Sequence, residues 1–324
     1  MQATIEEFLR DQLLDRRQRL KTAAEGAGAA RVRGLLEEVD AALARMDQGS
    51  WGICEACHEP VECDRLIADP LVRVCLDHLN EPERRALERD LELAAQVQKS
   101  LLPPCEIASR GWRVCYHYQP AGVVSGDYCD VVDAGDAGLY FMVGDVSGKG
   151  VAASMLMAHL HAMFRTLISV RLPLRVMMQH ASRVFAESTL PTQYATLVCG
   201  RAFDNGRVEV CNAGHPRPLV VRDGIVSEVD SAGLPVGLFG EEEFAVTELC
   251  LEPSQSMLVF SDGVTEAMDH DGAFYGPERL SRIAACCGAE MPSALIAACR
   301  EDLDSFCNGA RRADDMTLFA LGRA

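Results

Sequence analysis

The sequence has little positive charge, and it has no long stretch that is uniformly apolar. Its 31 lysines and arginines are outnumbered by 48 aspartates and glutamates, and the formal net charge is −17. This excess of negative charge argues against a non-specific grip on nucleic-acid phosphates. No uninterrupted apolar run approaches the length of a membrane span. We therefore expect neither direct nucleic-acid binding nor a membrane anchor.

The N-terminus lacks the apolar core of a secretory signal. Its first residues, MQATIEEFLRDQ, are polar and charged at short intervals. We therefore expect a cytoplasmic protein, in which the 14 cysteines serve as metal ligands or buried thiols rather than as disulfides. The 324 residues are enough for two domains, and the apolar fraction of 48% is ordinary for globular protein.

The first third of the chain has helical patterns. Apolar residues repeat at helical spacing over 4–24 and 32–46, and the segment AAEGAGAA between them predicts an antiparallel helical hairpin. A third helical pattern covers 81–102 and stops at Pro103-Pro104. Its residues Leu87, Leu91, Ala94, Gln98 and Leu101 recur at spacings of four and three. Such a seam pairs with its own copy in a dimer or docks on its own domain.

From about residue 105 the pattern changes to short apolar strands joined by glycine turns. Helical patterns interrupt the strands over 150–187, 277–285 and 292–306. Strands with helices in blocks indicate an α+β domain with packed sheets. We therefore expect three parts, which are a hairpin with a cysteine-rich segment at 1–80, a linker helix at 81–103 and the α+β domain at 104–324.

The cysteine-rich segment has the spacing of a zinc site. Cys54-x2-Cys57 is followed by Cys75-x2-His78, and each pair can clamp the ion from one tight turn. Four nitrogen and sulfur ligands leave no open position, so the expected Zn²⁺ is structural. The alternative is a set of buried thiols without metal.

The surrounding residues, ALARMDQGSWGICEACHEPVECDRLIADPLVRVCLDH, resemble the zinc finger of the DksA/TraR family over about 30–80. His78 stands where that family has its last cysteine, an exchange that zinc accepts. The family includes regulators of RNA polymerase that project a long helical hairpin, whereas the hairpin here is short.

The stretch GDVSGKG, residues 144–150, first suggests a phosphate-binding P-loop. A P-loop has four residues between its glycines and a Ser or Thr after its lysine. Here three residues separate Gly144 from Gly148, and Gly150 replaces the hydroxyl. An aspartate inside the loop would also repel phosphate. The P-loop interpretation is rejected, and Lys149 is expected to be peripheral.

Four acidic turns lie beside apolar strands instead. They are SGDYCD (125–130), VGDVSGKG (143–150), FSDGVTEAMD (260–269) and RADDMTLFA (312–320). Any one of them is ordinary turn chemistry. Four converging sets of carboxylates would repel one another unless cations bound between them, and oxygen-only ligands suit Mg²⁺ or Mn²⁺.

In order and spacing, these motifs resemble the metal-dependent PPM (type 2C) protein phosphatases, and most of all the bacterial SpoIIE/RsbU-type serine phosphatases. The resemblance covers about 90–322 and includes ELAAQVQKSLLP, GDYCD, GDVSGKG, YATLV, NAGHPRPLVV, GLPVG, FSDGVTEA and DDMTL. It implies a PPM-type domain of two packed β-sheets flanked by helices, with two Mg²⁺ or Mn²⁺ ions.

The resemblance also implies roles for single residues. Asp145 would bridge the two ions, the Val146 carbonyl would bind one of them, and Asp262 and Asp314 would hold the other. Asp127 would hold metal directly or through water. The lesser candidates are Asp130 as an assistant, Asp315 as the alternative to Asp314, and Asn212 and His215 of the NAGH motif, where His215 either caps a turn or contacts substrate.

The implied activity is hydrolysis of phosphoserine or phosphothreonine in a protein by a metal-activated water. In this branch the usual substrate is a phosphorylated STAS-type anti-sigma antagonist in a partner-switching pathway. The finger would regulate the enzyme, and the linker helix would pair in a homodimer. A different hypothesis is a transcription-linked interaction protein that acts on RNA polymerase through the finger. A minor one is a redox sensor that releases zinc when Cys54 or Cys57 is oxidised.

Overall fold

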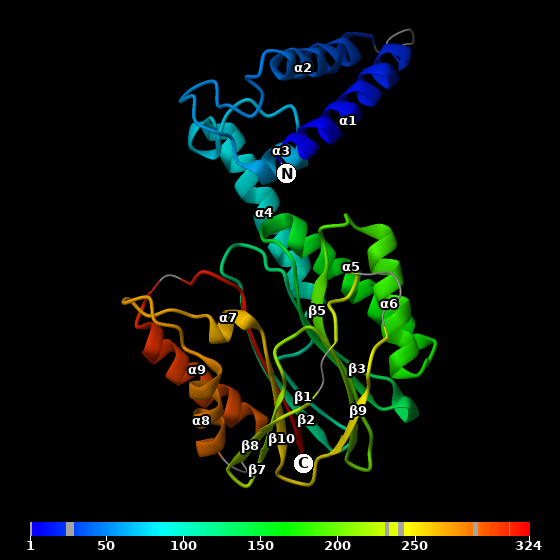
Figure 1. Cartoon of the computed structure of the whole chain (residues 1–324), viewed down its shortest axis with the longest axis vertical. Coiled ribbons are helices and arrows are strands. Elements are labelled where there is room, and N and C mark those ends of the chain that lie inside the picture. The colour runs from blue at the N-terminus through cyan, green and yellow to red at the C-terminus, as the bar shows by residue number, and fades with distance from the viewer. Residues whose placement is uncertain (1, 24–28, 231–232, 239–242, 288–290, 311) are drawn as a thin grey trace. The chain divides into compact units, whose positions relative to one another are not determined.

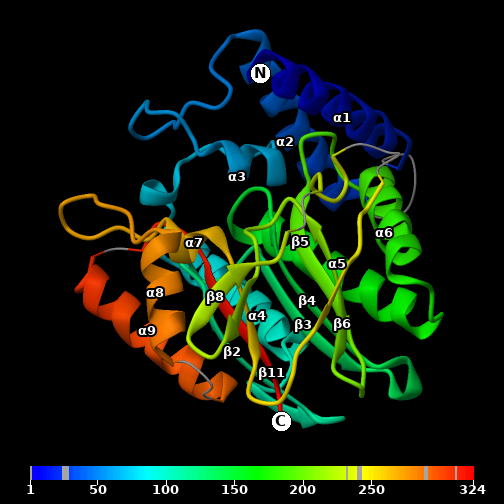
Figure 2. The same cartoon turned by 60° about the horizontal axis from the view of Figure 1, so that its bottom comes forward.

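The computed structural model describes residues 2–23, 29–230, 233–238, 243–287, 291–310 and 312–324 (Figures 1 and 2). The chain divides into two compact units, Met1–Asp90 and Leu91–Ala324. The boundary between the two units falls inside one helix, α4 (Glu81–Leu101).

The first unit begins with the predicted antiparallel hairpin of α1 (Gln2–Ala23) and α2 (Ala29–Asp47). Arg17 pairs with Asp40 at 2.6 Å, and Arg10 pairs with Asp47, so the two helices run in opposite directions. The buried faces meet in one cluster, whose members are Leu9, Leu13, Val39, Ala42, Leu43 and Met46. The hairpin prediction is confirmed.

The cysteine-rich segment follows the hairpin. Its only helical pieces among the described residues are the short helix α3 (Cys63–Ala68) and the 3-10 turn η1 (Leu76–His78). The linker helix α4 then starts with a capping box. The Glu83 N–H donates to Asn80 Oδ1 at 2.9 Å, and the Asn80 N–H donates back to Glu83 Oε2 at 3.0 Å.

The second unit contains two antiparallel sheets. The first has the order β1 (Glu106–Ser109), β2 (Trp112–Gln119), β11 (Met316–Arg323), β10 (Ser256–Phe260), β7 (Leu219–Arg222) and β8 (Ile225–Glu228). The second has the order β3 (Asp127–Asp133), β4 (Leu139–Val146), β5 (Ala195–Ala202), β6 (Arg207–Ala213) and β9 (Thr247–Cys250). A 3-10 turn, η2 (Gly135–Ala137), lies between β3 and β4.

Helices cover the outer face of each sheet, as Figure 1 shows. The pair α5 (Gly150–Ser169) and α6 (Leu174–Ser188) packs on the five-stranded sheet. The pair α8 (Pro277–Cys287) and α9 (Pro292–Cys307) packs on the six-stranded sheet. A third core lies between the sheets. The unit is therefore a four-layer α-β-β-α arrangement, and the predicted helices at 150–187, 277–285 and 292–306 are confirmed.

Strand β4 shows why the sequence there is apolar without alternation. Phe141 and Val143 point into the core between the sheets, whereas Tyr140 and Met142 point into the core under α5 and α6. Both faces are buried, so every position is apolar until Gly144. The strand ends at the predicted ligands Asp145 and Val146.

One expectation needs correction, and one open alternative is resolved at the C-terminal end of α4. The segment 125–130 is not only a turn, because Asp127 already begins β3. The linker seam is also used inside the second unit, since Gln98 is buried and its side-chain nitrogen donates to the Ser125 carbonyl at 2.6 Å. The interpretation of a helix that docks on its own domain therefore holds at this end of α4.

One described helix, α5, is long and apolar enough by composition to span a membrane. One of its faces, with Met157, Leu160, Phe164 and Ile168, is buried in the core. A single helix of this kind also occurs in the core of globular proteins, and we interpret α5 in that way.

Candidate active site

Two predicted ligands lie opposite each other in the five-stranded sheet. Asp127 begins β3 and pairs in register with Asp145 near the end of β4. By strand alternation, both point to the same face as Val131 and Val143, the face between the sheets. Directly opposite residues in an antiparallel pair have Cα atoms about 4.5–5.5 Å apart. The two carboxylates are therefore neighbours.

Two further predicted ligands lie in segments that flank strands of the six-stranded sheet. Asp262 begins the one-turn helix α7 (Asp262–Thr265) after β10, and Asp314 lies just before β11, the neighbour of β10. A Cβ at Gly263 would lie 1.9 Å from the Asp315 carbonyl oxygen and 3.3 Å from the Cβ of Asp314. Only glycine fits where these segments cross, and the crossing places Asp262 beside Asp314.

Hydroxyl groups hold Asp127 in place. Ser261 Oγ donates to Asp127 Oδ2 at 3.0 Å, and Thr317 Oγ1 donates to the same oxygen at 2.5 Å. The Thr317 N–H also donates to Ser261 Oγ at 2.9 Å. All three side chains are buried, so this network ties the two sheets together at the site. Ser261 and Thr317 were not predicted as site residues, although they lie in the FSDG and DDMTL motifs.

The carboxylates oppose one another's ionisation. Burial, followed by the charges of Asp262, Asp314 and Asp315, raises the pKa of Asp145 to about 7. Burial and Asp314 raise the pKa of Asp262. Burial and the charge of Asp145 raise the pKa of Asp127 well above its ordinary value. A cluster whose charged form is disfavoured in this way gains stability from bound cations.

Two of the predicted metal-binding oxygens lie next to Gly126. A Cβ at this residue would come 3.2 Å from both Asp145 Oδ1 and the Val146 carbonyl oxygen, and 3.3 Å from the Cβ of Ala153. Only a glycine therefore lets the chain pass this close to the two oxygens. Carboxylate and carbonyl oxygens are preferred ligands of Mg²⁺ and Mn²⁺. The donor atoms present are thus of the kind that the predicted ions require.

A side chain at Gly126 is expected to weaken metal binding. In Gly126→Ala, the new methyl group would push Asp145 Oδ1 and the Val146 carbonyl apart, and we expect the Kd for Mn²⁺ to rise about tenfold. Calorimetric titration of the metal-free protein measures this. Gly122→Ala in the same loop is the control, because its Cβ would meet its nearest atom, the Val124 carbonyl oxygen, at 3.7 Å. Equal Mn²⁺ affinities in the two variants would contradict the prediction.

Two other predicted aspartates have different partners. Asp315 accepts the N–H groups of Ala121 at 2.7 Å and Gly126 at 2.8 Å, so it anchors the loop before β3. Asp130 is fully buried and accepts two bonds from Arg165 of α5, at 2.6 and 2.7 Å. The structure does not bring Asp130 to the cluster, because strand alternation turns it toward α5. The suggested assisting role is corrected accordingly.

The NAGH motif closes a turn. Asn212 Nδ2 donates to the His215 carbonyl at 2.9 Å, and the His215 N–H donates to Asn212 Oδ1 at 2.8 Å. The His215 Nδ1 lies 2.9 Å from Thr196 Oγ1. Burial lowers the pKa of His215 to about 3, although a hydrogen bond to the Phe260 backbone opposes the shift. These contacts favour the turn role for a neutral His215 and give it no polar contact with the described aspartate cluster.

Lys149 differs from expectation. Its Nζ donates to Asp314 Oδ2 at 2.9 Å and to the Ala313 carbonyl at 2.8 Å. The lysine of GDVSGKG therefore belongs to the site rather than its periphery. The sequence signal was present, because the lysine lies only four residues after Asp145.

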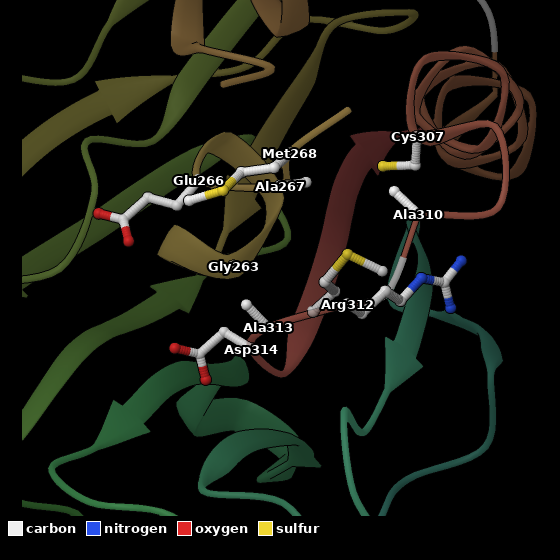
Figure 3. A pocket seen from close by; sticks show the side chains of 10 residues that line it. Gly263, Glu266, Ala267, Met268, Cys307, Ala310, Arg312, Ala313 and Asp314 are labelled. Carbon is white, nitrogen blue, oxygen red and sulfur yellow. The ribbon is translucent and has the colours of Figure 1, made fainter. Parts of the chain in front are cut away.

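A pocket lies next to the cluster and shares Asp314 and Gly263 with it (Figure 3). Met268, Cys307 and Met316 give it apolar walls. In Figure 3 the Arg312 side chain points away from the Asp314 carboxylate.

The predicted zinc ligands converge in the first unit. The ligand atoms of Cys54, Cys57, Cys75 and His78 lie within 4.8 Å of one another. The Cys57 and Cys75 sulfurs are 3.8 Å apart, and His78 Nδ1 is 3.2 Å from the Cys75 sulfur. A tetrahedral zinc with Zn–S bonds of about 2.3 Å requires sulfurs about 3.8 Å apart. The side chains therefore fit the ion.

The two buried cysteines of this cluster differ in acidity. Burial opposes ionisation of Cys54, but N–H groups of Cys75, Cys57 and Ala56 lower its pKa to about 6. Burial and hydrogen bonding with the other two thiols raise the pKa of Cys75 to about 11. The group thus holds one thiolate near neutral pH, which is the form that binds metal.

Comparison with known proteins gives a family match and similar folds. The model of the family described as Stage II sporulation protein E (SpoIIE) matches residues 135–324. Protein IcfG of Synechocystis sp. is 26% identical over 263 residues, which cover 72% of this chain and 41% of IcfG. Phosphoserine phosphatase RsbP of Bacillus subtilis is 27% identical over 186 residues, which cover 55% of this chain and 46% of RsbP.

This chain therefore spans less than half the length of those two relatives. The solved structure of the SiaA-PP2C domain of Pseudomonas aeruginosa has a TM-score of 0.63 at 18% identity and covers 73% of this chain and 97% of that chain. The likeness at this identity concerns the fold. It confirms the predicted α+β domain with two packed sheets flanked by helices.

Proposed function

We propose that this chain, which belongs to the SpoIIE family, is a metal-dependent protein phosphatase that hydrolyses phosphoserine or phosphothreonine. The observation that carries the proposal is the convergence of four carboxylates, two from strands of one sheet and two from segments that flank β10 and β11 of the other. Their proximity helps to raise the pKa of Asp145 to about 7. The match to a phosphoserine phosphatase over 55% of this chain supports the choice of substrate.

The residues have separate tasks in this proposal. Asp145, the Val146 carbonyl, Asp262, Asp314 and Asp127 would hold two Mg²⁺ or Mn²⁺ ions. When bound, the ions supply a Lewis acid for the phosphoryl group and lower the pKa of water. The chain itself orients these ligands.

The supporting contacts explain that orientation. Ser261 and Thr317 fix Asp127 by their hydroxyl groups. Asp315 holds the loop that carries Gly126, and so keeps this glycine against Asp145. No side chain is required as a covalent nucleophile, because the site needs only to position water and substrate.

Metal dependence tests the proposal. The purified chain is expected to hydrolyse p-nitrophenyl phosphate and a phosphoserine peptide with Mn²⁺, to lose the activity in EDTA, and to regain it when Mn²⁺ is restored. Phosphate release measures both reactions. Activity that persists in EDTA after exhaustive dialysis would contradict the two-metal assignment, and absence of activity with every divalent cation would contradict the enzyme assignment.

The pathway is part of the proposal. The resemblance to RsbU-type phosphatases supports a phosphorylated STAS-type anti-sigma antagonist as substrate in a partner-switching pathway of the cytoplasm. We assign 104–324 to catalysis, 81–103 to a linker and 1–80 to regulation through a DksA/TraR-type finger that binds one structural Zn²⁺. The convergence of Cys54, Cys57, Cys75 and His78 supports this assignment.

The linker helix is proposed to pair in a homodimer. Leu93 and Val97 lie one turn apart on α4 and are 59% and 55% exposed, which is high for large apolar residues. A Leu93→Glu variant is expected to be monomeric at micromolar concentrations where the unaltered chain is a dimer, as light scattering after gel filtration would show. Val184→Glu on α6, a 37% exposed valine, is the control. A variant that remains dimeric would contradict this interface.

A further inference from the structure

The conformation of the loop after β4 directs Lys149 at the active site. Gly148 and Gly150 flank the lysine with φ values of 100° and 72°, and a Cβ at either glycine would meet nothing within 4 Å. The glycines are therefore required by the backbone path rather than by crowding. The path places Lys149 Nζ 2.9 Å from Asp314 Oδ2.

Lys149 lies on the open side of the cluster. Its side chain is 64% exposed and that of Asp314 is 39% exposed, whereas Asp127 is buried. The lysine has a flexible four-carbon stem, and its contacts are one ion pair and one bond to the Ala313 carbonyl. The ammonium can therefore leave Asp314 without disturbing packed residues.

The charge of the site requires an additional cation for phosphate. The two divalent ions of the proposed function would neutralise the four aspartates and leave no net positive charge for a phosphomonoester dianion. Among the described residues, Lys149 is the only cation that forms an ion pair with one of these four aspartates. Arg312 is close in sequence, but it donates to Asp304 at 2.7 Å and points away from the Asp314 carboxylate (Figure 3).

Lysine is a rare residue in this chain, and one of the few lysines is at position 149. Lysine occurs only at positions 21, 99 and 149, and arginine supplies the rest of the positive side chains. A compact ammonium with three donors contacts a phosphate as a point charge, whereas the wide guanidinium fork suits fixed bidentate pairs. Position 149, between two glycines and next to Asp314, thus has the side chain that suits reversible binding of a phosphate group.

We propose that Lys149 binds the phosphate group of the substrate, and that it moves from Asp314 to the phosphate when divalent cations occupy the carboxylates. This inference rests on the proposed function. Lys149 then holds Asp314 before metal binding and the phosphoryl oxygens after it. It also assigns a residue of the GDVSGKG motif to substrate recognition rather than to the metal ions.

Calorimetry and kinetics with Lys149→Met, Lys149→Arg and the control Lys99→Met test the proposal. Lys99 is an exposed residue of α4 in the same unit. In Lys149→Met, we expect the Kd of inorganic phosphate for the Mn²⁺-loaded protein and the KM for p-nitrophenyl phosphate to rise about tenfold or more. The Kd for Mn²⁺ should stay the same or fall, because Asp314 loses a competing cation. Lys149→Arg should restore part of the phosphate affinity.

The outcomes separate this inference from the function on which it rests. A weaker Mn²⁺ affinity in Lys149→Met with unchanged phosphate affinity would overturn the inference, because the lysine would then only position Asp314. Equal phosphate affinities in Lys149→Met and Lys99→Met would overturn it as well. A wild-type chain that binds phosphate through Lys149 without turning over any phosphomonoester would contradict the proposed function and support the inference.

Discussion

Replacing Asp145 by asparagine is expected to lower Mn²⁺-dependent turnover by about 1000-fold or more while it raises the thermal stability of the metal-free protein. Asp145 is proposed to be shared by both ions, so its loss removes a ligand from each. Asparagine keeps the size of the side chain and removes the charge that Asp262 and Asp314 oppose. Activity and stability should therefore change in opposite directions, which an unfolded variant cannot imitate.

The stability change has a defined pH window. The pKa of Asp145 rises from its ordinary value of 3.8 to about 7 in the folded, metal-free protein. The folded state therefore binds the proton more tightly than the unfolded state, and stability falls as the pH rises from about 4 to about 7. We expect the melting temperature of the metal-free wild type to fall between pH 5 and pH 8, and that of Asp145→Asn to fall less.

Asp136→Asn is the matched control, because this aspartate is exposed in the turn η2 before β4. It should leave turnover and the pH dependence of melting unchanged. If Asp145→Asn turned over substrate at the rate of Asp136→Asn, the catalytic assignment would be wrong. If it melted below the wild type at pH 8 without metal, the repulsion argument would be wrong.

The candidate site could be predicted from sequence because its ligands lie in motifs with fixed order. Asp145, Asp262 and Asp314 each come at the end or the beginning of a strand, where a short apolar run meets a glycine or a second aspartate. The pattern locates the strand ends. It does not say which ends meet, and that information came from the resemblance to a family.

The face of the strand or helix to which a side chain points was harder to predict than the place where the element begins or ends. Asp127 and Asp130 are three residues apart in one motif, and only the start of β3 at Asp127 puts them on opposite faces. The same holds for the linker, where the seam that contains Gln98 turns inward and Leu93 stays exposed. Lys149 was misjudged for a different reason, since its contact with Asp314 joins residues 165 positions apart. No local pattern records such a contact.

Loss of zinc is the second large effect that we expect, and it concerns the first unit. The buried core of the finger consists of Val61, Leu66 and the two proposed zinc ligands Cys54 and Cys75. A core of this size cannot offset the conformational entropy of the segment, and structural zinc contributes about 10–16 kcal/mol in isolated fingers at pH 7. Removing zinc should therefore unfold the finger. The second unit has its own three cores and should keep its thermal transition.

Two cysteines of the same segment allow a matched comparison. Cys57 is a proposed ligand in the cluster, whereas Cys63 is exposed and lies outside it. We expect Cys57→Ser to lose the single equivalent of zinc, as elemental analysis measures. It should also lose the calorimetric unfolding transition of the finger, which is the transition that a chelator abolishes in the wild type. Cys63→Ser should keep both. Zinc retained by Cys57→Ser, or lost by Cys63→Ser, would contradict the ligand set.

The same pair of variants tests whether the finger regulates catalysis. Both keep the aspartate cluster and Lys149, so a difference in Mn²⁺-dependent turnover between them must come from the state of the finger. Under the proposed regulation, Cys57→Ser differs from the wild type in turnover or in oligomeric state, and Cys63→Ser matches the wild type in both. If Cys57→Ser lost its zinc and the folded structure of the finger while turnover and oligomeric state stayed unchanged, the finger would be a separate module with no control over the phosphatase unit.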